Sequence, residues 1–266
     1  MSENQAVLFE KKGPVGIITI NNPPVNSLSH DVFEGFRAQL DANIGDRELR
    51  AMIITGSGDR AFCAGADLSS GFGVYSAADF LQRGQDIWNK IEEYPKPIIA
   101  AVNGNALGGG CELAMACHVR FFHSGLNAKG KKSVIGLSET GLGIMPGYGG
   151  TMRMPRLIGR SKALRYILTA ERLEPEQALE DGLVDFLSSD AAACQSDAIA
   201  FAKMLATRPP LAVREVLKIF ARMGSMTQEQ HLKMERESLA GLFSTKDTME
   251  GMTAFAQKRE PKFTGE

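Results

Sequence analysis

Short apolar runs alternate with amphipathic stretches along most of the chain. Near the N-terminus, residues 6–9 and 15–20 have the length and composition of β-strands. The Lys-Lys-Gly-Pro segment at residues 11–14 contains a Gly-Pro step, which is typical of a turn. The pattern therefore predicts a β-hairpin at the start of the fold.

An α/β alternation follows the hairpin. Ser29 has the residue type of a helix N-cap, and the apolar side chains after it recur at helical spacing, at Val32, Phe33, Phe36 and Leu40. The remaining pattern predicts a buried strand at 51–55, a helix at 77–94 ended by prolines, a strand at 98–102, a helix at 109–117 and a strand at 119–122. Strands that alternate with helices predict an α/β core with a parallel sheet.

The last third of the chain is almost entirely helical in pattern. From residue 161 onward only residues 183–187 are expected to form a strand. The final helices are expected at 211–220, 228–242 and 247–258, where they would form a cap. Because no linker-like composition or internal repeat divides the chain, we expect residues 1–200 to form a core and residues 201–266 a helical region of the same unit.

Composition narrows the choice of partner. The 266 residues have a formal net charge of −1 and include no long uncharged apolar run, which argues against nucleic acid or a membrane as the main partner. The four cysteines form no C-x-x-C pair and are expected to be reduced thiols. With no targeting pattern in the first residues, we expect a cytoplasmic protein that acts on a small molecule.

The densest chemical signal lies at residues 103–117. Three glycines, at 108, 109 and 110, come just before a helical run that contains Glu112. Glycine is unfavourable in a helix, so three at its start need a reason. Either their backbone N–H groups point at an anionic oxygen, or the helix packs closely on the sheet. Both interpretations remain open from these residues alone.

Two further glycine-containing segments accompany this one. Residues 61–67 follow a predicted buried strand, where open α/β sheets often bind ligands. Residues 137–151 place Glu139 just before a Gly/Pro-rich loop that enters a helix. Taken singly, the turn is a weak signal, and a lone glutamate on a loop is usually solvated.

Taken in order, four segments resemble the crotonase (enoyl-CoA hydratase/isomerase) superfamily: residues 22–28, 62–67, 106–112 and 143–151. The similarity extends from about Phe9 to Phe263. It implies a ββα-superhelix spiral core with a helical C-terminal trimerisation region, assembled as homotrimers or dimers of trimers. The implied activity is enoyl-CoA hydration without a cofactor, because coenzyme A is part of the acyl-CoA substrate.

The resemblance also implies roles for individual residues. Glu112 would chiefly activate the water and Glu139 would chiefly deliver the α-proton, while the backbone N–H groups of Ala66 and Gly109 would bind the thioester oxygen. Contacts with CoA or the acyl group are implied for Val25, Ala64, Asp67, Leu68, Phe255 and Lys258. The last two residues often come from a neighbouring subunit in the family, and residues 69–80 are expected to shape the acyl pocket.

The chain departs from the family pattern in one place. Glu139 follows Glu112 by 27 positions, which exceeds the usual spacing, and the extra residues fall within 124–133. Gly125, Gly130 and Lys131 have the spacing of a phosphate-binding P-loop, but Lys132 replaces its Ser/Thr and a strand-like pair follows. We therefore expect a polar surface loop with solvated lysines, and no nucleotide site.

Other functions fit the sequence less well. Another crotonase-type enzyme, either an isomerase or a hydratase for cyclic or branched acyl groups, is the main alternative. An RNA-binding homologue is disfavoured, because the lysines at 129, 131 and 132 form only a short cluster. The four histidines lack metal-ligand spacing, and residues 104–110 do not form a dinucleotide-binding motif, so no metal or dinucleotide is expected.

Overall fold

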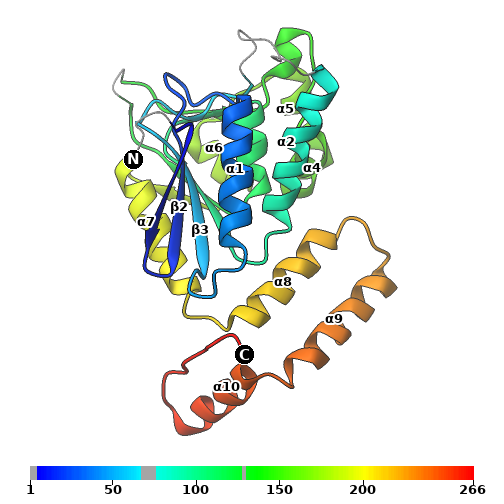
Figure 1. The fold of residues 1–266 in the computed structure, drawn as a ribbon. Coiled ribbons are helices and arrows are strands. Elements are labelled where there is room, and N and C mark those ends of the chain that lie inside the picture. The colour runs from blue at the N-terminus through cyan, green and yellow to red at the C-terminus, as the bar shows by residue number, and fades with distance from the viewer. Residues whose placement is uncertain (1–4, 67–75, 128–129) are drawn as a thin grey trace.

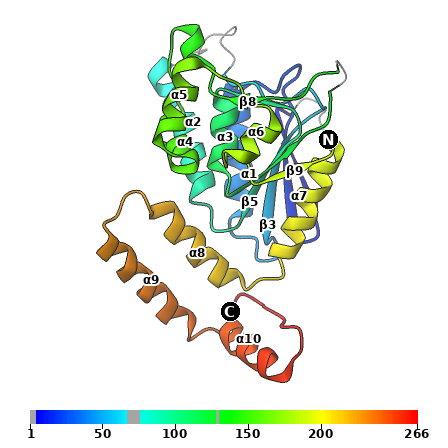
Figure 2. The ribbon, with the colours of Figure 1, turned by 180° about the vertical axis from the view of Figure 1, so that it is seen from behind.

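The computed structural model describes residues 5–66, 76–127 and 130–266. A six-stranded sheet has the order β1-β2-β3-β5-β7-β9, and a three-stranded sheet has the order β4-β6-β8. The strands are β1 (Val7–Lys12), β2 (Val15–Ile20), β3 (Ala51–Gly56), β4 (Ala61–Cys63), β5 (Ile98–Val102), β6 (Asn105–Leu107), β7 (Val119–His123), β8 (Ile135–Gly136) and β9 (Phe186–Ser188). Helices cover both faces of the larger sheet, which confirms the predicted α/β core (Figures 1 and 2).

The helices follow the predicted order along the chain. They are α1 (His30–Asn43), α2 (Ala77–Glu92), α3 (Gly109–Ala116), the 3-10 helix η1 (Glu139–Leu142), α4 (Gly150–Ile158), α5 (Arg160–Thr169), α6 (Pro175–Glu180), α7 (Ala191–Leu205), α8 (Pro210–Arg222), α9 (Gln228–Leu242) and α10 (Lys246–Gln257). The predicted N-cap of α1 is confirmed, because the Ser29 side chain accepts a hydrogen bond from the backbone N–H of Val32.

The N-terminal hairpin is tighter than predicted. β1 and β2 pair antiparallel with Lys12 opposite Val15, so only Gly13 and Pro14 form the turn. The predicted hairpin and its Gly-Pro turn are therefore confirmed, but the first strand extends beyond the predicted residue 9 to Lys12. β1 is an edge strand of the sheet, and lysine is a residue type that edge strands tolerate and use against further pairing.

The predicted strand at 183–187 is displaced toward the C-terminus in the structure, where β9 is Phe186–Ser188. Leu183 and Val184 are buried, but their backbone N–H groups both donate to the Ala178 carbonyl oxygen, at 2.8 and 3.2 Å. These bonds close the end of α6. The apolar residues at 183–184 are thus explained by burial in the core and not by strand pairing.

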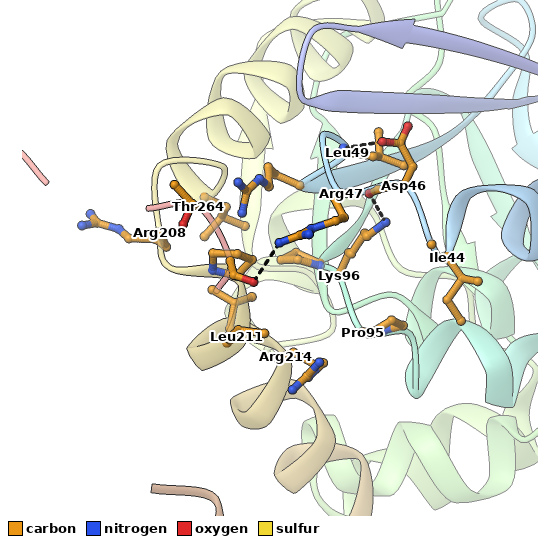
Figure 3. A pocket seen from close by; sticks show the side chains of 17 residues that line it. Ile44, Asp46, Arg47, Leu49, Pro95, Lys96, Arg208, Leu211, Arg214 and Thr264 are labelled. Carbon is orange, nitrogen blue, oxygen red and sulfur yellow. Dashed lines mark hydrogen bonds between the residues drawn. The ribbon is translucent and has the colours of Figure 1, made fainter. Parts of the chain in front are cut away.

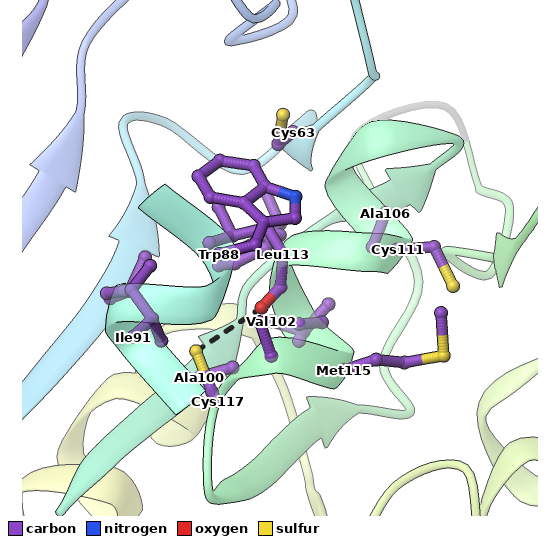
Figure 4. Close-up of a cluster of buried hydrophobic side chains, with 14 of the residues drawn as sticks. Cys63, Trp88, Ile91, Ala100, Val102, Ala106, Cys111, Leu113, Met115 and Cys117 are labelled. Atoms are coloured by element: carbon purple, nitrogen blue, oxygen red, sulfur yellow. Dashed lines mark hydrogen bonds between the residues drawn. The ribbon is translucent and has the colours of Figure 1, made fainter. Parts of the chain in front are cut away.

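The core lies on the two faces of the parallel strands. Every residue of β3 and β5 is buried, as expected for parallel strands that are covered by helices on both faces. On the α3 side, Trp88 of α2, Leu113 of α3 and Cys63 belong to one cluster of buried hydrophobic side chains (Figure 4). All four cysteines are free and buried. This cluster fixes α3 against the sheet and thereby positions Glu112.

Helices α8–α10 form an arm that projects from the α/β body (Figures 1 and 2). Neither α8 nor α9 has a buried residue. Large apolar side chains on the arm are exposed, among them Val216, Phe220, Leu239, Phe243, Met249, Met252 and Phe255. Because α7 packs on the sheet through its whole length, the body extends a little beyond residue 200, to about Leu205. Among the described residues, no helix is long and apolar enough to cross a membrane.

A cavity of about 260 Å³ lies at the root of the arm (Figure 3). Basic side chains from the body and the arm line it, including Arg50, Lys96 and Arg214. Two of them bind backbone, because Arg50 donates to the Phe263 carbonyl oxygen at 3.3 Å and Lys96 donates to the Asn43 carbonyl oxygen at 2.7 Å. Since Lys96 precedes β5, this cavity is at the amino ends of the strands, away from the turn that leads into α3.

The inserted segment is more firmly attached than a surface loop. Ser124 donates its backbone N–H to the Ser188 carbonyl oxygen at 2.8 Å, and the fully buried Ser133 hydroxyl lies 3.0 Å from His123 Nε2. Lys132 is not simply solvated, because its Nζ lies 2.9 Å from a carboxylate oxygen of Glu176. The described residues from 124 to 132 are partly or fully exposed, as expected of a surface loop, but Ser133 is buried and Lys132 is paired with a carboxylate.

These contacts predict that the segment supports the fold. Replacing residues 124–133 with a short Gly/Ser turn removes the Ser133 partner of His123 and the Ser124 bonds. We expect the thermal midpoint to fall by about 4–10 °C, since each buried hydrogen bond lost costs about 1–3 kcal/mol. Differential scanning calorimetry would measure this. Lys131→Ser, at an exposed position, is the control and should leave the midpoint unchanged. An unchanged midpoint for the replacement would contradict the structural role.

Candidate active site

The turn from β6 into α3 explains the three glycines. Gly108 has φ +54°, which side chains disfavour, and a Cβ there would lie 3.2 Å from Glu139 Oε1. A Cβ at Gly110 would collide with the Cys63 carbonyl oxygen, so this glycine permits close packing of α3 on β4. At Gly109, a Cβ would lie 2.7 Å from Leu28 Cδ1. Close packing is thus established at Gly110, and Gly108 brings the turn against Glu139.

Glu112 is fully buried in the first turn of α3. Its Oε1 accepts hydrogen bonds from the backbone N–H groups of Tyr148 at 2.8 Å and Gly150 at 2.7 Å. Its Oε2 has no hydrogen-bond partner among the residues that the structure describes. One carboxylate oxygen is therefore anchored by backbone, and the other is available to a ligand or water.

Glu139 begins η1 and is also buried. Its carboxylate lies against the Gly108 turn, and within the described part of the chain its Oε2 lacks a hydrogen-bond partner. The prediction of a loop glutamate near the site is thus refined to a carboxylate on a short 3-10 helix. The two glutamates, far apart in sequence, approach the same turn from different elements.

Burial changes the acidity of both carboxyl groups. Desolvation raises the pKa of Glu112 to about 7, although the Gly150 and Tyr148 N–H groups favour its charged form and the Glu139 charge opposes it. Desolvation also raises the pKa of Glu139. A carboxyl group that titrates near neutral pH can both accept and release a proton under physiological conditions.

The two predicted N–H donors come from segments that lie against each other. A Cβ at Gly65 would lie 3.4 Å from the Gly109 nitrogen. The neighbouring Ala66 is held by a parallel bridge to Leu28, whose N–H donates to the Gly65 carbonyl oxygen at 2.8 Å. Gly109 is the first residue of α3, where helix geometry leaves N–H groups without an intrahelical acceptor. The arrangement therefore suits an oxygen that gains negative charge.

The other predicted substrate contacts fall into three groups. Val25 and Ala64 are brought together, since the Ala64 N–H donates to the Val25 carbonyl oxygen at 3.1 Å. Asp67 and Leu68, and most of residues 69–80, lie outside the described residues. Phe255 and Lys258 are on or just after α10, at the far end of the arm from the α3 of the same chain (Figure 2).

Two of the histidines have structural contacts. His118 Nδ1 accepts a hydrogen bond from the Ile98 backbone N–H at 2.8 Å, and burial lowers the pKa of His118 to about 4. His123 pairs with Ser133. Within residues 5–66, 76–127 and 130–266, no group of three or more His, Cys, Asp or Glu side chains is placed to hold a metal ion.

Comparison with known proteins identifies the family. Residues 10–266 match the family model described as enoyl-CoA hydratase/isomerase. The chain belongs to this family. It is 39% identical to a probable enoyl-CoA hydratase from Bacillus subtilis, over 95% of this chain and 96% of that protein. It is 37% identical to a crotonyl-CoA hydratase from Syntrophomonas wolfei, over 97% of each.

The fold comparison agrees with the family assignment. A crystal structure of an enoyl-CoA hydratase from Bacillus anthracis superimposes with a TM-score of 0.91 at 35% identity, and the match covers 98% of this chain and 100% of that one. The predicted crotonase fold is therefore confirmed. In this family member, the β6–α3 turn and η1 place the two glutamates at one site.

Sequence reasoning missed the residues that hold Glu112. The segment Tyr148–Gly150 supplies both N–H groups, and Arg153 donates to the Tyr148 carbonyl oxygen at 2.9 Å. The Gly-Tyr-Gly-Gly sequence at residues 147–150 indicates a loop after Glu139 but does not indicate what the loop binds. Nothing in the sequence indicates that this loop folds back over α3, because that contact depends on how α4 packs.

The raised pKa of Glu112 predicts a stability change. In the unfolded chain the carboxyl group ionises near 4.5, whereas in the folded protein it ionises near 7. The free energy of unfolding therefore falls as pH rises from 4.5 to 7 and stays lower above 7. Glu112→Gln keeps an oxygen acceptor and removes this cost, so it should raise the free energy of unfolding at pH 8 by on the order of 1–3 kcal/mol.

Urea unfolding at several pH values would measure this difference. The gain should shrink toward zero at pH 4.5 and below, where both proteins carry a neutral side chain. A gain of the same size at all pH values, or a loss at pH 8, would contradict the burial of an ionisable carboxyl group at this position.

Proposed function

We propose that this protein is an enoyl-CoA hydratase that adds water across the α,β double bond of an acyl-CoA thioester. The observation that carries the proposal is the pair of buried carboxylates at one turn, Glu112 and Glu139, each with an oxygen lacking a partner among the described residues. Relatives that match nearly the whole chain carry hydratase names, such as crotonyl-CoA hydratase. Both findings support hydration over a reaction that needs one carboxylate.

The thioester oxygen is proposed to bind the backbone N–H groups of Ala66 and Gly109. Attack of water at Cβ shifts electrons toward this oxygen, which gains enolate character. Preorganised donors in a site closed to water stabilise such charge by roughly 3–4 kcal/mol each at the transition state. The proximity of Gly65 to the Gly109 nitrogen supports this pairing, and the N-terminus of α3 adds a favourable dipole.

Glu112 and Glu139 are proposed to divide the proton transfers. Glu112 takes a proton from water through its free Oε2 while Oε1 stays bound to backbone, and the hydroxyl oxygen bonds to Cβ. Glu139 delivers a proton to Cα as the enolate electrons return. A pKa of about 7 suits Glu112 for this role, because it is partly ionised at neutral pH and basic enough to accept the proton.

The assembly is proposed to be a homotrimer or a dimer of trimers. The arm exposes apolar side chains on all three helices, and Phe255 is 87% exposed. Large exposed apolar patches mark interaction surfaces. In such an assembly, Phe255 and Lys258 would reach the acyl-CoA of a neighbouring subunit rather than their own. The reaction as proposed needs no cofactor, and a cytoplasmic location suits the four free cysteines.

Substitution of the two glutamates tests the proposed chemistry. Glu112→Gln and Glu139→Gln should each lower kcat for crotonyl-CoA hydration by on the order of 10²–10⁴, with acyl-CoA affinity nearly unchanged. Loss of absorbance by the conjugated thioester measures the rate, and calorimetry measures binding. The exposed Glu180→Gln is the control and should keep normal turnover. Near-normal turnover in both site variants would refute the assignment.

The oxyanion hole is tested at Gly109. Gly109→Val places side-chain atoms where Leu28 and Tyr148 already lie, and disturbs the N–H that faces the thioester. We expect hydration to be abolished, with the oligomeric state and thermal midpoint checked first. Gly45→Val, where a Cβ meets nothing within 4 Å, is the matched control. A folded Gly109→Val variant with normal activity would exclude Gly109 as a donor.

A further inference from the structure

Arg153 is a buried cation in the first turn of α4. Its Nε and Nη2 donate to the same carboxylate oxygen of Glu92, at 2.9 and 2.7 Å, and Nη2 also donates to Asn89 Oδ1 at 2.7 Å. Its side chain is 3% exposed. A buried ion pair is often no more stabilising than apolar residues of similar volume. Stability alone therefore does not explain why a charged residue is buried at position 153.

A fourth contact links Arg153 to the catalytic site. Its Nη1 donates to the Tyr148 carbonyl oxygen at 2.9 Å. The Tyr148 N–H, at the other end of the same residue, donates to Glu112 Oε1, as does the Gly150 N–H. Between them, Gly149 has φ +100°, and a side chain there would collide with the guanidinium group. The segment 148–150 is thus held between Arg153 and Glu112.

We infer that Arg153, itself anchored by Glu92, is a positioning residue that holds segment 148–150 on Glu112 and adds a positive charge near that carboxylate. The inference rests on the proposed role of Glu112 as the base in hydration. It assigns Glu92 a part in the reaction although Glu92 lies on α2 and does not contact Glu112. Contacts thus link Glu92 on α2 to Arg153 on α4, then to segment 148–150 and to Glu112 on α3. We call this series of contacts the relay.

The ionisation of Glu112 depends on the charged groups around it. Among the described residues, its ionisation responds to the negative charge of Glu139 on η1 and to the positive charge of Arg153 on α4. The Tyr148 hydroxyl and the adjacent Cys111 thiol are neutral, because burial raises the pKa of each. Arg153 is thus a positive charge that opposes the effect of Glu139 on Glu112.

The relay predicts opposite changes for its two ends. Arg153→Met removes the positive charge and frees segment 148–150, so the acid limb of the kcat/KM profile for crotonyl-CoA should move to higher pH by about 0.5–1 unit. At pH 7, kcat should fall by about 10-fold to 100-fold with little change in KM. Glu92→Gln leaves the arginine charge uncompensated, so the acid limb should move to lower pH. Arg153→Lys should lie between wild type and Arg153→Met.

Arg156→Met is the matched control. Arg156 Nη1 also lies near Glu92, at 3.7 Å, but its side chain is 42% exposed, and no hydrogen bond joins it to segment 148–150 in the described structure. Its pH profile should match wild type. If Arg153→Met does not fold because Glu92 is left unpaired, the double variant Glu92→Gln/Arg153→Met removes both charges and should still show the slower turnover.

A readout independent of turnover separates this inference from the proposed function. Carbon-13 NMR titration of the Glu112 carboxyl group, assigned with Glu112→Gln, should show the same opposite shifts in Arg153→Met and Glu92→Gln. Unmoved titration in both variants would overturn the relay, even with normal wild-type hydration. Shifted titration with no hydration by wild type would instead refute the proposed function and leave the positioning contacts standing.

Discussion

The burial of the Glu112 carboxylate beneath segment 148–150 is the interaction on which the rest of the site depends. An unpaired charge inside an apolar helix would cost several kcal/mol and would protonate instead. Two backbone N–H groups reduce that cost by binding Oε1, while Oε2 has no partner in the part of the chain that the structure describes. Burial and these hydrogen bonds together leave the pKa of Glu112 near 7, so the carboxyl group is partly ionised at neutral pH.

This interaction constrains elements that are distant in sequence. α3 must lie close to β4, and this requires a glycine at position 110, where a Cβ would collide with the Cys63 carbonyl oxygen. The turn before α3 must take a positive φ at Gly108, so that Glu139 can approach. α4 must begin at Gly150 with the Gly150 N–H directed at Glu112. The α/β body therefore holds the two glutamates, whereas the arm exposes apolar side chains. The two regions place different demands on their sequences.

Local patterns predicted most of the fold but failed where tertiary contacts override them. The first strand of the hairpin is longer than the pattern predicts, because Lys12 pairs with Val15. The strand expected at 183–187 begins later than predicted, because the N–H groups of Leu183 and Val184 bind the end of α6. The residue pattern predicts a polar surface loop at 124–133, yet Ser133 at its end is buried and bonded to His123. In each case the partner that decides the outcome lies on another segment, so no local window contains the information.

By itself, the sequence determined most strands of the larger sheet, the main helices, the family, and the two glutamates with their glycine-rich turns, since these depend on residue types at fixed local spacings. The smaller sheet, with β4 and β6, was not predicted. The tertiary structure decided what those residues meet. It placed Tyr148 and Gly150 over Glu112, set Arg153 behind them, and separated the arm from the site of its own chain. Acidity and orientation depend on distances across the fold, and such distances follow from packing rather than from spacing along the chain.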